Sequence, residues 1–508
     1  ATYRCADGEQ EYSPRLRYMR FRYAGVRGID AADLEIEGLV LHSDLDQVGE
    51  FTSSNELINR LQSAIEWGGR SNFVDIPTDC PQRDEREGWT GDYAVFASTA
   101  SFNFDMSRFV DKWLRDVSAE QTRGGGIPMV VPKAGIPYPD VATSTWGDVC
   151  VLAPWAEYLA RGDLDLLRRQ YPTMKRFLGA ARRWSELFSF GDNRRIWKLP
   201  FHFGDWTAPD LTAKEWIARG RWVATAYFAN SCDIAAQVAD LPGHTANAAR
   251  SPKLRPEIVR AYRNVFTDGP GTLRTEFQTA YVLPLHFGMT EGAETEAMAD
   301  NLVRLIDEAD GHLATGFPGT PYLLFALSDS GRVAEAYDLL LQEGAPSWLY
   351  MVASGGTTIW ERWDALRPDG TVNIAELHGD GSEEDSGGGM VSFNHYAAGA
   401  VGDWLYRRVA GLEAIEGGYR RFRVAPVPGG GLTSAAARIR TPYGTASSSW
   451  TLDDTQFALR VEVPVSTTCE VVLPDGTVHE VTSGAHEFAC SVVPVSAATS
   501  AVTTVTTQ

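Results

Sequence analysis

The sequence contains few cysteines and no long apolar run. Its 508 residues include six cysteines. None forms a CxxC pair, which argues against a disulfide-rich scaffold and against a zinc site. No stretch of eighteen apolar residues occurs, so we predict no membrane-spanning helix. Cys469 and Cys490 lie in one late segment and could pair with each other.

Positive charge is also scarce. The sequence has 46 lysines and arginines against 66 aspartates and glutamates, a formal net charge of −20. Such a field repels phosphate backbones and anionic lipids, so we expect neither nucleic acid nor a membrane surface as partner. A neutral ligand fits better. No phosphate-binding loop, HExxH motif or dinucleotide fingerprint occurs, and we expect no metal and no cofactor.

The N-terminal residues, ATYRCADGEQEY, show no leader pattern. A cytoplasmic and a secreted location therefore both stay open. The sequence does not indicate an oligomeric state.

The hydrophobic pattern divides the chain into four parts. Residues 1–50 alternate as in β-strands, and we interpret them as the last strands of a truncated N-terminal β-sandwich with a linker. Residues 51–412 follow the helical period and predict about a dozen helices. Residues 413–492 alternate again and predict a C-terminal antiparallel β-sandwich. Residues 493–508 form a low-complexity tail.

The fold predicted from this pattern is mainly α. Ser53 and Glu56 match a capping box at the start of the first helix, and Phe109, Trp113 and Val117 line one face of a later helix. No sequence repeat of 20–50 residues is present, so we favour closure of the helices into an α/α barrel over an open solenoid. Loops at one end of such a barrel meet over a shallow funnel, where we expect the site.

The most polar loop is PTDCPQRDEREGWTGD, residues 77–92. Pro77 and Pro81 exclude a regular helix, so its acids lie on an irregular loop. A solvated loop with arginine counterions is the simpler interpretation. Trp89 among the acids favours a sugar, whose C–H face stacks on the ring while its hydroxyls need acceptors. The surrounding negative charge should raise the pKa of the Cys80 thiol, which argues against a nucleophilic role.

A second segment, GGTTIWERWDALRPDG, encloses Glu361 between Trp360 and Trp363. These residues could belong to the core. Alternatively, Glu361 is a carboxylate in an aromatic pocket, where desolvation raises its pKa. Two acids on distant segments are what glycoside hydrolysis requires, one to protonate the leaving oxygen and one to activate water or attack.

A third segment, MVSFNHYAAGAVGDWLY, places His395 at the start of a helix. His395 could be a hydrogen-bonding residue at a helix end or a sugar ligand. The acidic, glycine-rich loop before it lacks the spacing of a calcium loop, and we interpret it as solvated charge.

Together these segments resemble the α-L-rhamnosidases of glycoside hydrolase family 78. The resemblance covers nearly the whole chain and implies an inverting enzyme that releases terminal α-L-rhamnose from glycosides, flavonoids or polysaccharides. The implied fold is an (α/α)6 barrel flanked by β-sandwich domains. The motifs occur in the family's order: FVDIPTDCPQRDEREGWTGD, STWGDVCVLAPWAEYLARGD, FGDW, FQTAYVLPLHFGM, GTPYLL, GAPSWLYMVASGGTTIWERWD and SFNHYAAGAVGDWLY.

Site roles also follow from the resemblance. It implies Glu85 as the general acid and Glu361 as the general base, with a water held between them, so their carboxyl groups should lie roughly 6.5–9.5 Å apart. Glu87 stands where the family usually has an apolar residue, and its charge should raise the pKa of Glu85. Sugar contacts are expected from Asp79, Arg83, Trp89, Asp92, Trp146, Trp206, Trp360 and His395.

Two other functions were weighed against hydrolysis. A polysaccharide lyase on the same scaffold would cleave rhamnose from glucuronate by β-elimination. A carbohydrate-binding relic would have lost the acid or the base. Because Glu85 and Glu361 are both present, the sequence favours the hydrolase.

Overall fold

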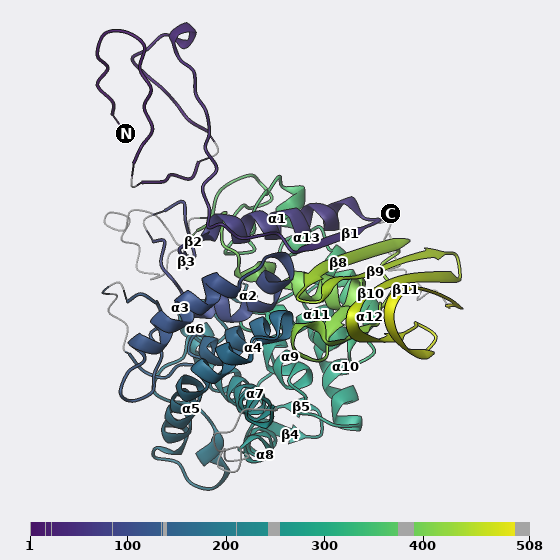
Figure 1. Cartoon of the computed structure of the whole chain (residues 1–508). Coiled ribbons are helices and arrows are strands. Elements are labelled where there is room, and N and C mark those ends of the chain that lie inside the picture. The colour runs from purple at the N-terminus through teal and green to yellow at the C-terminus, as the bar shows by residue number, and fades with distance from the viewer. Residues whose placement is uncertain are drawn as a thin grey trace, which may run out of the picture.

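Helices occupy the middle of the chain, and its last part forms a β-sheet (Figure 1). The structure, a computed structural model, describes residues 2–492 except 16, 22, 84, 134, 136–139, 210, 242–253 and 374–390. The predicted tail and the acidic loop before His395 lie outside these residues. Within the described part, no helix is both long and apolar enough to cross a membrane.

Helices extend from Glu56 to Val409. The α-helices are α1 (Glu56–Asn72), α2 (Thr90–Asn103), α3 (Ser107–Glu120), α4 (Val149–Arg161), α5 (Leu164–Glu186), α6 (Ala213–Ala218), α7 (Gly220–Asp240), α8 (Arg255–Phe266), α9 (Gln278–His286), α10 (Ala293–Asp307), α11 (Thr320–Ser328), α12 (Val333–Leu341), α13 (Trp348–Ala353) and α14 (Gly402–Trp404). Shorter helical segments are η1 (Ala31–Asp33), η2 (Gly191–Arg195), η4 (Ala397–Val401), the π-helical η5 (Leu405–Val409) and η6 (Gly417–Tyr419).

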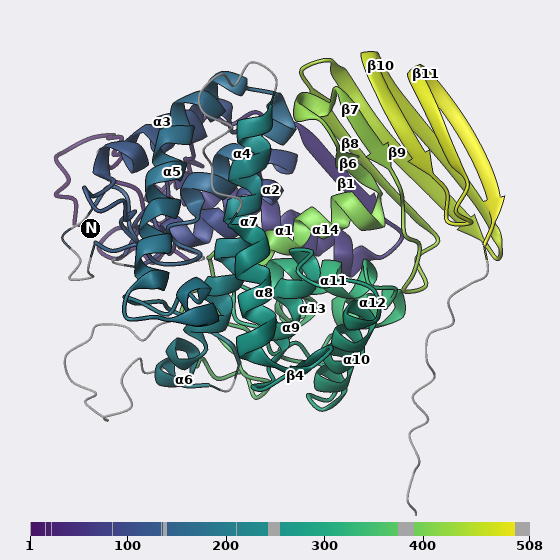
Figure 2. The ribbon, with the colours of Figure 1, turned by 90° about the horizontal axis from the view of Figure 1, so that it is seen from below.

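Six helical segments pack against one another in a ring (Figure 2). Following the chain, α2 contacts α4, α4 contacts α7, α7 contacts α9, α9 contacts α11 and α11 contacts η4, which returns to α2. Other helices cover this ring from outside: α3 and α5 contact α4, α8 contacts α7, α10 contacts α9 and α12 contacts α11.

The amino-acid pattern explains which helices lie inside. Helix α2 is enclosed on all sides and buries nearly every residue, whereas α3 buries one face. The buried face of α3 contains the predicted stripe of Phe109, Trp113 and Val117. The predicted capping box is wrong, because Asn55 caps α1 through bonds from the Leu57 and Ile58 N–H groups.

Strands β2 and β3, and strands β4 and β5, form two separate two-stranded sheets. The other seven described strands are mostly C-terminal and form one hydrogen-bonded sheet in the order β1-β8-β9-β10-β7-β6, with β11 also paired to β10. Within it, β10 pairs with β9 through its first half and with β7 through its second half. The strands are β1 (Gly49–Ser53), β2 (Phe73–Val74), β3 (Ile76–Pro77), β4 (Thr267–Gly269), β5 (Thr272–Leu273), β6 (Leu412–Ala414), β7 (Arg421–Val424), β8 (Ser434–Thr441), β9 (Gly444–Asp453), β10 (Gln456–Val472) and β11 (Val478–Ser491).

The suggested disulfide is wrong. Cys469 lies opposite Val481 in the β10–β11 register, whereas Cys490 lies opposite Phe457 near the other end of the ladder. Both cysteines are free. Their closeness in sequence comes from a hairpin whose two strands bring other residues together.

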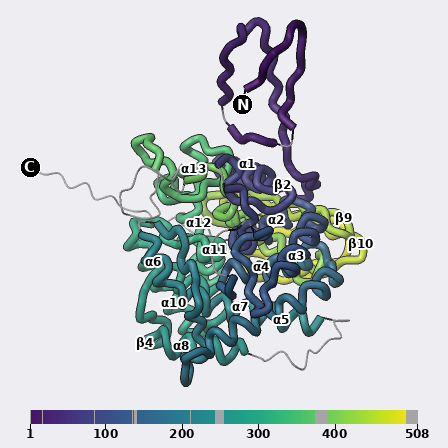
Figure 3. The backbone as a smooth tube through the Cα atoms, turned by 90° about the vertical axis from the view of Figure 1, so that its left-hand side faces the viewer, coloured from purple at the N-terminus to yellow at the C-terminus, as the bar shows by residue number. Residues whose placement is uncertain are grey.

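The predicted strands in residues 1–50 are also largely wrong. Among the described residues before Gly49, the structure contains the short η1 turn and an isolated bridge from Gln47 to Phe104, but no strand. The segment forms a long loop that leaves the helices near α1 (Figures 1 and 3). Its alternating residues have no neighbouring strand in the described chain, and an unpaired strand is not stable.

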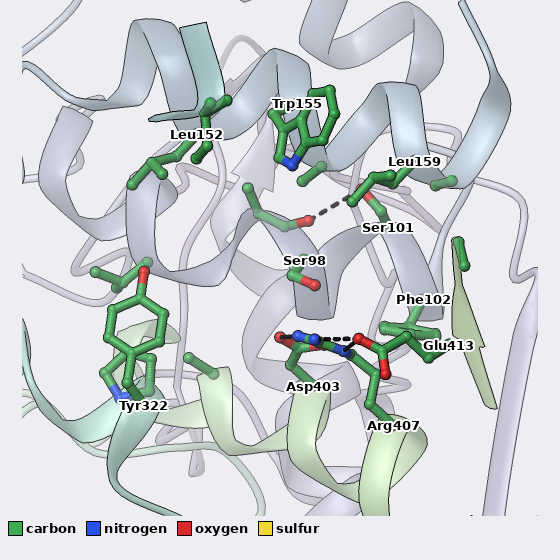
Figure 4. Close-up of a pocket in the computed structure, with 18 of the residues that line it drawn as sticks. Ser98, Ser101, Phe102, Leu152, Trp155, Leu159, Tyr322, Asp403, Arg407 and Glu413 are labelled. Atoms are coloured by element: carbon green, nitrogen blue, oxygen red, sulfur yellow. Dashed lines mark hydrogen bonds and ion pairs between the residues drawn. The ribbon is translucent and has the colours of Figure 1, made fainter. Parts of the chain in front are cut away.

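An ion-pair network joins the helices to the sheet beside a cavity of about 290 Å³ (Figure 4). Arg407 on η5 bonds Asp403 of α14 at 3.1 Å and also Glu413 of β6. Burial alone would raise the pKa of Glu413, but the guanidinium groups of Arg407 and Arg408 lower it to about 2. The network therefore requires an ionised Glu413.

We expect Arg407→Ala to lower the free energy of unfolding by about 3–5 kcal/mol, because it leaves the largely buried Asp403 without its ion-pair partner and leaves Glu413 with Arg408 alone. The ion pairs of Glu413 contribute fully above pH 4.5 and are lost as the pH falls towards 2. The difference in the free energy of unfolding between Arg407→Ala and the wild type should therefore shrink as the pH falls over that range. Denaturant unfolding at several pH values measures this. Arg438→Ala removes an exposed pair with Glu50 and should have a much smaller effect. Equal effects of both variants would contradict a special role of Arg407.

Candidate active site

The predicted site residues gather where the ring segments begin. Trp89 is the N-cap residue of α2, Trp146 shortly precedes α4, and His395 shortly precedes η4. These positions are also close in space, because Trp89 and Trp146 both contact Phe203, and His395 pairs with Asp92 of α2. The funnel expected at one end of a barrel stays a prediction.

A tight backbone contact fixes the end of the loop that carries Glu85. The Val131 N–H donates to the Gly88 carbonyl, and the Thr90 N–H donates to the Met129 carbonyl, each at 2.9 Å. A Cβ atom at Gly88 would lie 2.1 Å from the Val131 carbonyl oxygen, so only glycine allows this approach.

Arg83 brings the two predicted catalytic acids together. Its Nη2 atom forms an ion pair with Glu85 and lies 3.5 Å from Glu361 Oε2. The Trp89 indole N–H donates to Glu85 Oε1 at 3.1 Å. The closest oxygens of the two acids are therefore nearer to each other than the predicted 6.5–9.5 Å, because both contact one nitrogen atom.

The two acids differ in their surroundings. The Glu361 side chain is 9% exposed and the Glu85 side chain is 26% exposed. Burial raises the pKa of Glu361, while the charges of His395 and Arg83 act against this rise. Glu361 is thus a shielded carboxylate with cationic neighbours, and Glu85 is the acid closer to solvent.

Asp79 lies beneath Glu85 and is buried. Burial, with the nearby charges of Glu85 and Asp92, raises the pKa of Asp79 to about 8. Its carboxyl group is hydrogen bonded to Glu85 and accepts the Glu87 N–H at 3.0 Å. At neutral pH the Asp79–Glu85 pair therefore holds a proton.

His395 and Asp92 form a second buried pair, with Nε2 2.8 Å from Oδ1. Burial alone would lower the pKa of His395, but the charge of Asp92 and the bond to it raise the pKa to about 9. The backbone N–H of His395 donates to the Ile359 carbonyl, and the backbone N–H of Glu361 donates to the Ser392 carbonyl. The third motif thus lies directly against the second.

Three of the predicted tryptophans meet in one aromatic cluster. Trp146 packs against Phe203 with ring centroids 4.2 Å apart, and Phe203 contacts both Trp89 and Trp206. Phe203 lies within the FGDW motif but was not predicted as a site residue. Phe201, Phe317 and Met129 complete this cluster and were not predicted either.

Asp205 fixes the FGDW turn from below. It is fully buried, accepts bonds from Thr279 Oγ1 and the Gly316 N–H, and pairs with Arg219 at 2.9 Å. This network holds the adjacent Trp206 in the aromatic cluster. Asp205 is thus a supporting residue within the FGDW motif that was not predicted from the sequence.

Trp360 does not join the cluster. It is buried in the main core, where its ring lies edge-on to Phe393 and Tyr350. These contacts are those of a core residue that supports Glu361 from behind, which matches the simpler of the two interpretations of this segment.

Cys80 and Glu87 also lie beside the acids. Burial and the charge of Glu361 raise the pKa of the Cys80 thiol well above its usual value, in the direction expected from the sequence. Burial and the charge of Glu85 raise the pKa of Glu87. The expected effect of Glu87 on Glu85 stays a prediction.

Two groups at this site are close enough to hold a cation. One comprises Cys80, Glu361 and His395, and the other comprises Asp79, Cys80 and Glu85. Both contain the protonated Cys80 thiol, a poor ligand in that state. The guanidinium of Arg83 and the His395 imidazolium already supply positive charge, so the residues suit proton transfer better than cation binding.

Comparison with known proteins identifies the family. Residues 46–409 match the model of the bacterial α-L-rhamnosidase 6 hairpin glycosidase domain, and residues 411–487 match that of the bacterial α-L-rhamnosidase C-terminal domain. The chain belongs to this α-L-rhamnosidase family. The resemblance noted in the sequence is therefore confirmed.

Several α-L-rhamnosidases are similar over most of this chain. A protein of Formosa agariphila is 37% identical over 475 residues, which are 92% of this chain and 49% of that protein. The crystal structure of the Streptomyces avermitilis α-L-rhamnosidase complexed with L-rhamnose is 39% identical, with a TM-score of 0.79, over 89% of this chain and 43% of that one. The crystal structure of the Aspergillus terreus α-L-rhamnosidase is 35% identical, with a TM-score of 0.81, over 90% of this chain and 52% of that one. The chain spans about half the length of these relatives.

We expect Asp92→Asn to lower the pKa of His395 by roughly 1–3 pH units, because it removes the carboxylate that favours the imidazolium. NMR titration of histidine-labelled protein, with the His395 signal assigned by its substitution, measures the midpoint. The control is Asp116→Asn, a change at a surface aspartate paired with Lys112, which should leave the His395 titration in place. An unchanged midpoint in Asp92→Asn would show that another group holds the proton.

Proposed function

We propose that this chain hydrolyses terminal α-L-rhamnosides with inversion, using Glu85 as general acid and Glu361 as general base. The observation that carries the proposal is the pair of carboxylates bridged by Arg83 beside an aromatic cluster, in a member of the α-L-rhamnosidase family. Sugar rings stack on such aromatic faces, and glycoside hydrolysis needs two such acids.

The proposed reaction is a single displacement. Glu361 takes a proton from a water molecule while the oxygen of that water attacks the anomeric carbon. The glycosidic C–O bond breaks, and the leaving oxygen takes a proton from Glu85. The greater exposure of Glu85 suits delivery of a proton to a leaving group that extends towards solvent, while the buried Glu361 faces the sugar.

Asp79 supports the acid in this proposal. A carboxyl group with a pKa of about 8 keeps a proton on the Asp79–Glu85 pair at neutral pH. That proton passes to the leaving oxygen through Glu85, the more exposed member of the pair. The charges of His395 and Arg83 counteract the rise in the pKa of Glu361 and so favour the ionised form that a base needs.

Inversion requires space for a water molecule between the acids. We propose that Arg83 turns from its bridging position towards the sugar hydroxyls when rhamnose binds, which separates Glu85 from Glu361. Asp92 holds His395 so that its imidazolium also faces the sugar beside Glu361. Trp89, Trp146 and Trp206 form the apolar wall against which the sugar packs.

The proposal extends to the finer architecture. We propose that the ring of helices is a closed (α/α)6 barrel over residues 51–412, supported by the return contact of η4 with α2 and by the six-hairpin description of the matching family. We also propose a β-sandwich over residues 413–492. The change of β10 from β9 to β7 along its length supports two layers.

The stereochemical course is tested with p-nitrophenyl α-L-rhamnopyranoside by proton NMR of the released sugar. We expect the β-anomer first, because water attacks opposite to the leaving group. Initial release of the α-anomer would indicate a retaining enzyme, an outcome that the short distance between the acids would then explain. No release from a folded sample would contradict the proposed activity.

The roles of the two acids are tested by Glu85→Gln and Glu361→Gln. Each should lower kcat by about 10²–10⁴ without unfolding the protein. p-Nitrophenolate is a good leaving group and needs little protonation, so Glu85→Gln should be impaired less on this substrate than on an alkyl rhamnoside. Glu361→Gln should be impaired equally on both. Glu87→Gln is the matched control on the same loop, and an equal loss there would overturn the assignment.

The proton-holding role of Asp79 predicts a change in the pH profile. In Asp79→Asn, the side-chain amide donates to the Glu85 carboxylate and favours its charged form, so the alkaline limb of kcat/KM should move to lower pH. Measurement of kcat/KM from pH 4 to 10 checks this. A lower plateau with the alkaline limb in place would show that Asp79 acts only in binding.

A further inference from the structure

The long N-terminal loop contacts the catalytic domain at a defined point. Among its described residues from 2 to 42, only Tyr18, Arg20 and Leu34 are half-buried, and the others are exposed. Phe21, for example, is 66% exposed. Tyr18 is therefore a specific point of attachment within an otherwise exposed segment.

Tyr18 contacts Arg86, the residue between Glu85 and Glu87. The Arg86 guanidinium lies over the Tyr18 ring, 4.8 Å from its centroid, and its Nη1 donates to the Tyr18 carbonyl at 3.3 Å. Arg20 also lies over this ring, at 5.6 Å. Burial, with the nearby charge of Arg86, lowers the pKa of Arg20 to about 10, so this contact is partly shielded from water.

Arg86 adopts a backbone conformation that needs support. Its φ angle is +58°, in the left-handed region that residues other than glycine rarely occupy. This conformation sets the direction of the peptides on either side. On one side Glu85 bonds with Trp89, and on the other the Glu87 N–H bonds with Asp79.

We propose that Tyr18 is a positioning residue for Glu85, because its ring and carbonyl hold Arg86 in the left-handed conformation on which the Glu85 geometry depends. This inference rests on the proposed function of Glu85. A residue 68 positions earlier in the chain thereby supports the catalytic loop. Neither the periodicity nor the motifs of the sequence pointed to Tyr18.

The kinetic test compares Tyr18→Ala, Tyr18→Phe and Phe21→Ala in the full chain. Tyr18→Ala should lower kcat by roughly ten- to hundredfold with little change in KM, because it displaces the acid rather than the sugar contacts. Tyr18→Phe keeps the ring and the carbonyl and should retain activity within about twofold. Phe21→Ala, the exposed control, should resemble wild type. Wild-type kcat in Tyr18→Ala would overturn the proposal.

A double-mutant cycle with Arg86→Gly isolates the backbone effect. Glycine adopts positive φ without a Cβ penalty, so the loop should no longer depend on Tyr18. Tyr18→Ala should then cost at most about twofold in the Arg86→Gly background. An equal loss in both backgrounds would show that Tyr18 acts by another route.

A spectroscopic measurement separates this inference from the proposed function. The indole N–H resonance of Trp89, assigned with Trp89→Phe, reports its bond to Glu85. It should shift in Tyr18→Ala and stay in place in Phe21→Ala, whether or not the wild type hydrolyses a rhamnoside. A resonance that does not move in Tyr18→Ala would overturn the positioning role even if hydrolysis is confirmed.

Discussion

The site depends on the balance of charge around Arg83. Several carboxyl groups lie within one largely buried region, and their mutual repulsion would open it if all were ionised without partners. Three features reduce that repulsion: Arg83 bridges Glu85 and Glu361, Asp79 keeps a proton, and His395 carries a positive charge beside Asp92. The same balance separates a carboxyl pair that holds a proton from a carboxylate with cationic neighbours, so one set of contacts both reduces the repulsion and makes the two acids different.

Much of this site could be predicted because each motif is local. Trp89, Trp146 and His395 each lie next to the start of a ring segment, so finding the helices from their periodicity also located the loops that carry these predicted site residues. Proline and glycine marked the irregular loop around Glu85. The helical part and the sheet-forming part were separable for the same reason, since a change from the helical period to alternation needs no knowledge of tertiary contacts.

The wrong predictions concern choices that local pattern does not decide. Cys469 and Cys490 are close in sequence, but strand register assigns them other neighbours. Asn55 and Ser53 both suit a helix cap, and Ser53 instead belongs to β1. The bridge from Arg83 to Glu361 joins residues 278 positions apart, so the distance between the two acids could not be predicted from the spacing of the motifs. Trp360 beside an acid suits a sugar wall or a core equally well in sequence.

The pairing of β1 with β8 has a consequence for the order in which the protein forms. Glu50 and Arg438 face each other across this pair although 388 positions separate them. On the ribosome, β1 emerges before any of the helical region, but its partner is made only after that region is complete. The edge of β1 must therefore stay unpaired while the helices form around their own contacts. Its short length, five residues, limits the exposed edge available for aggregation during that interval.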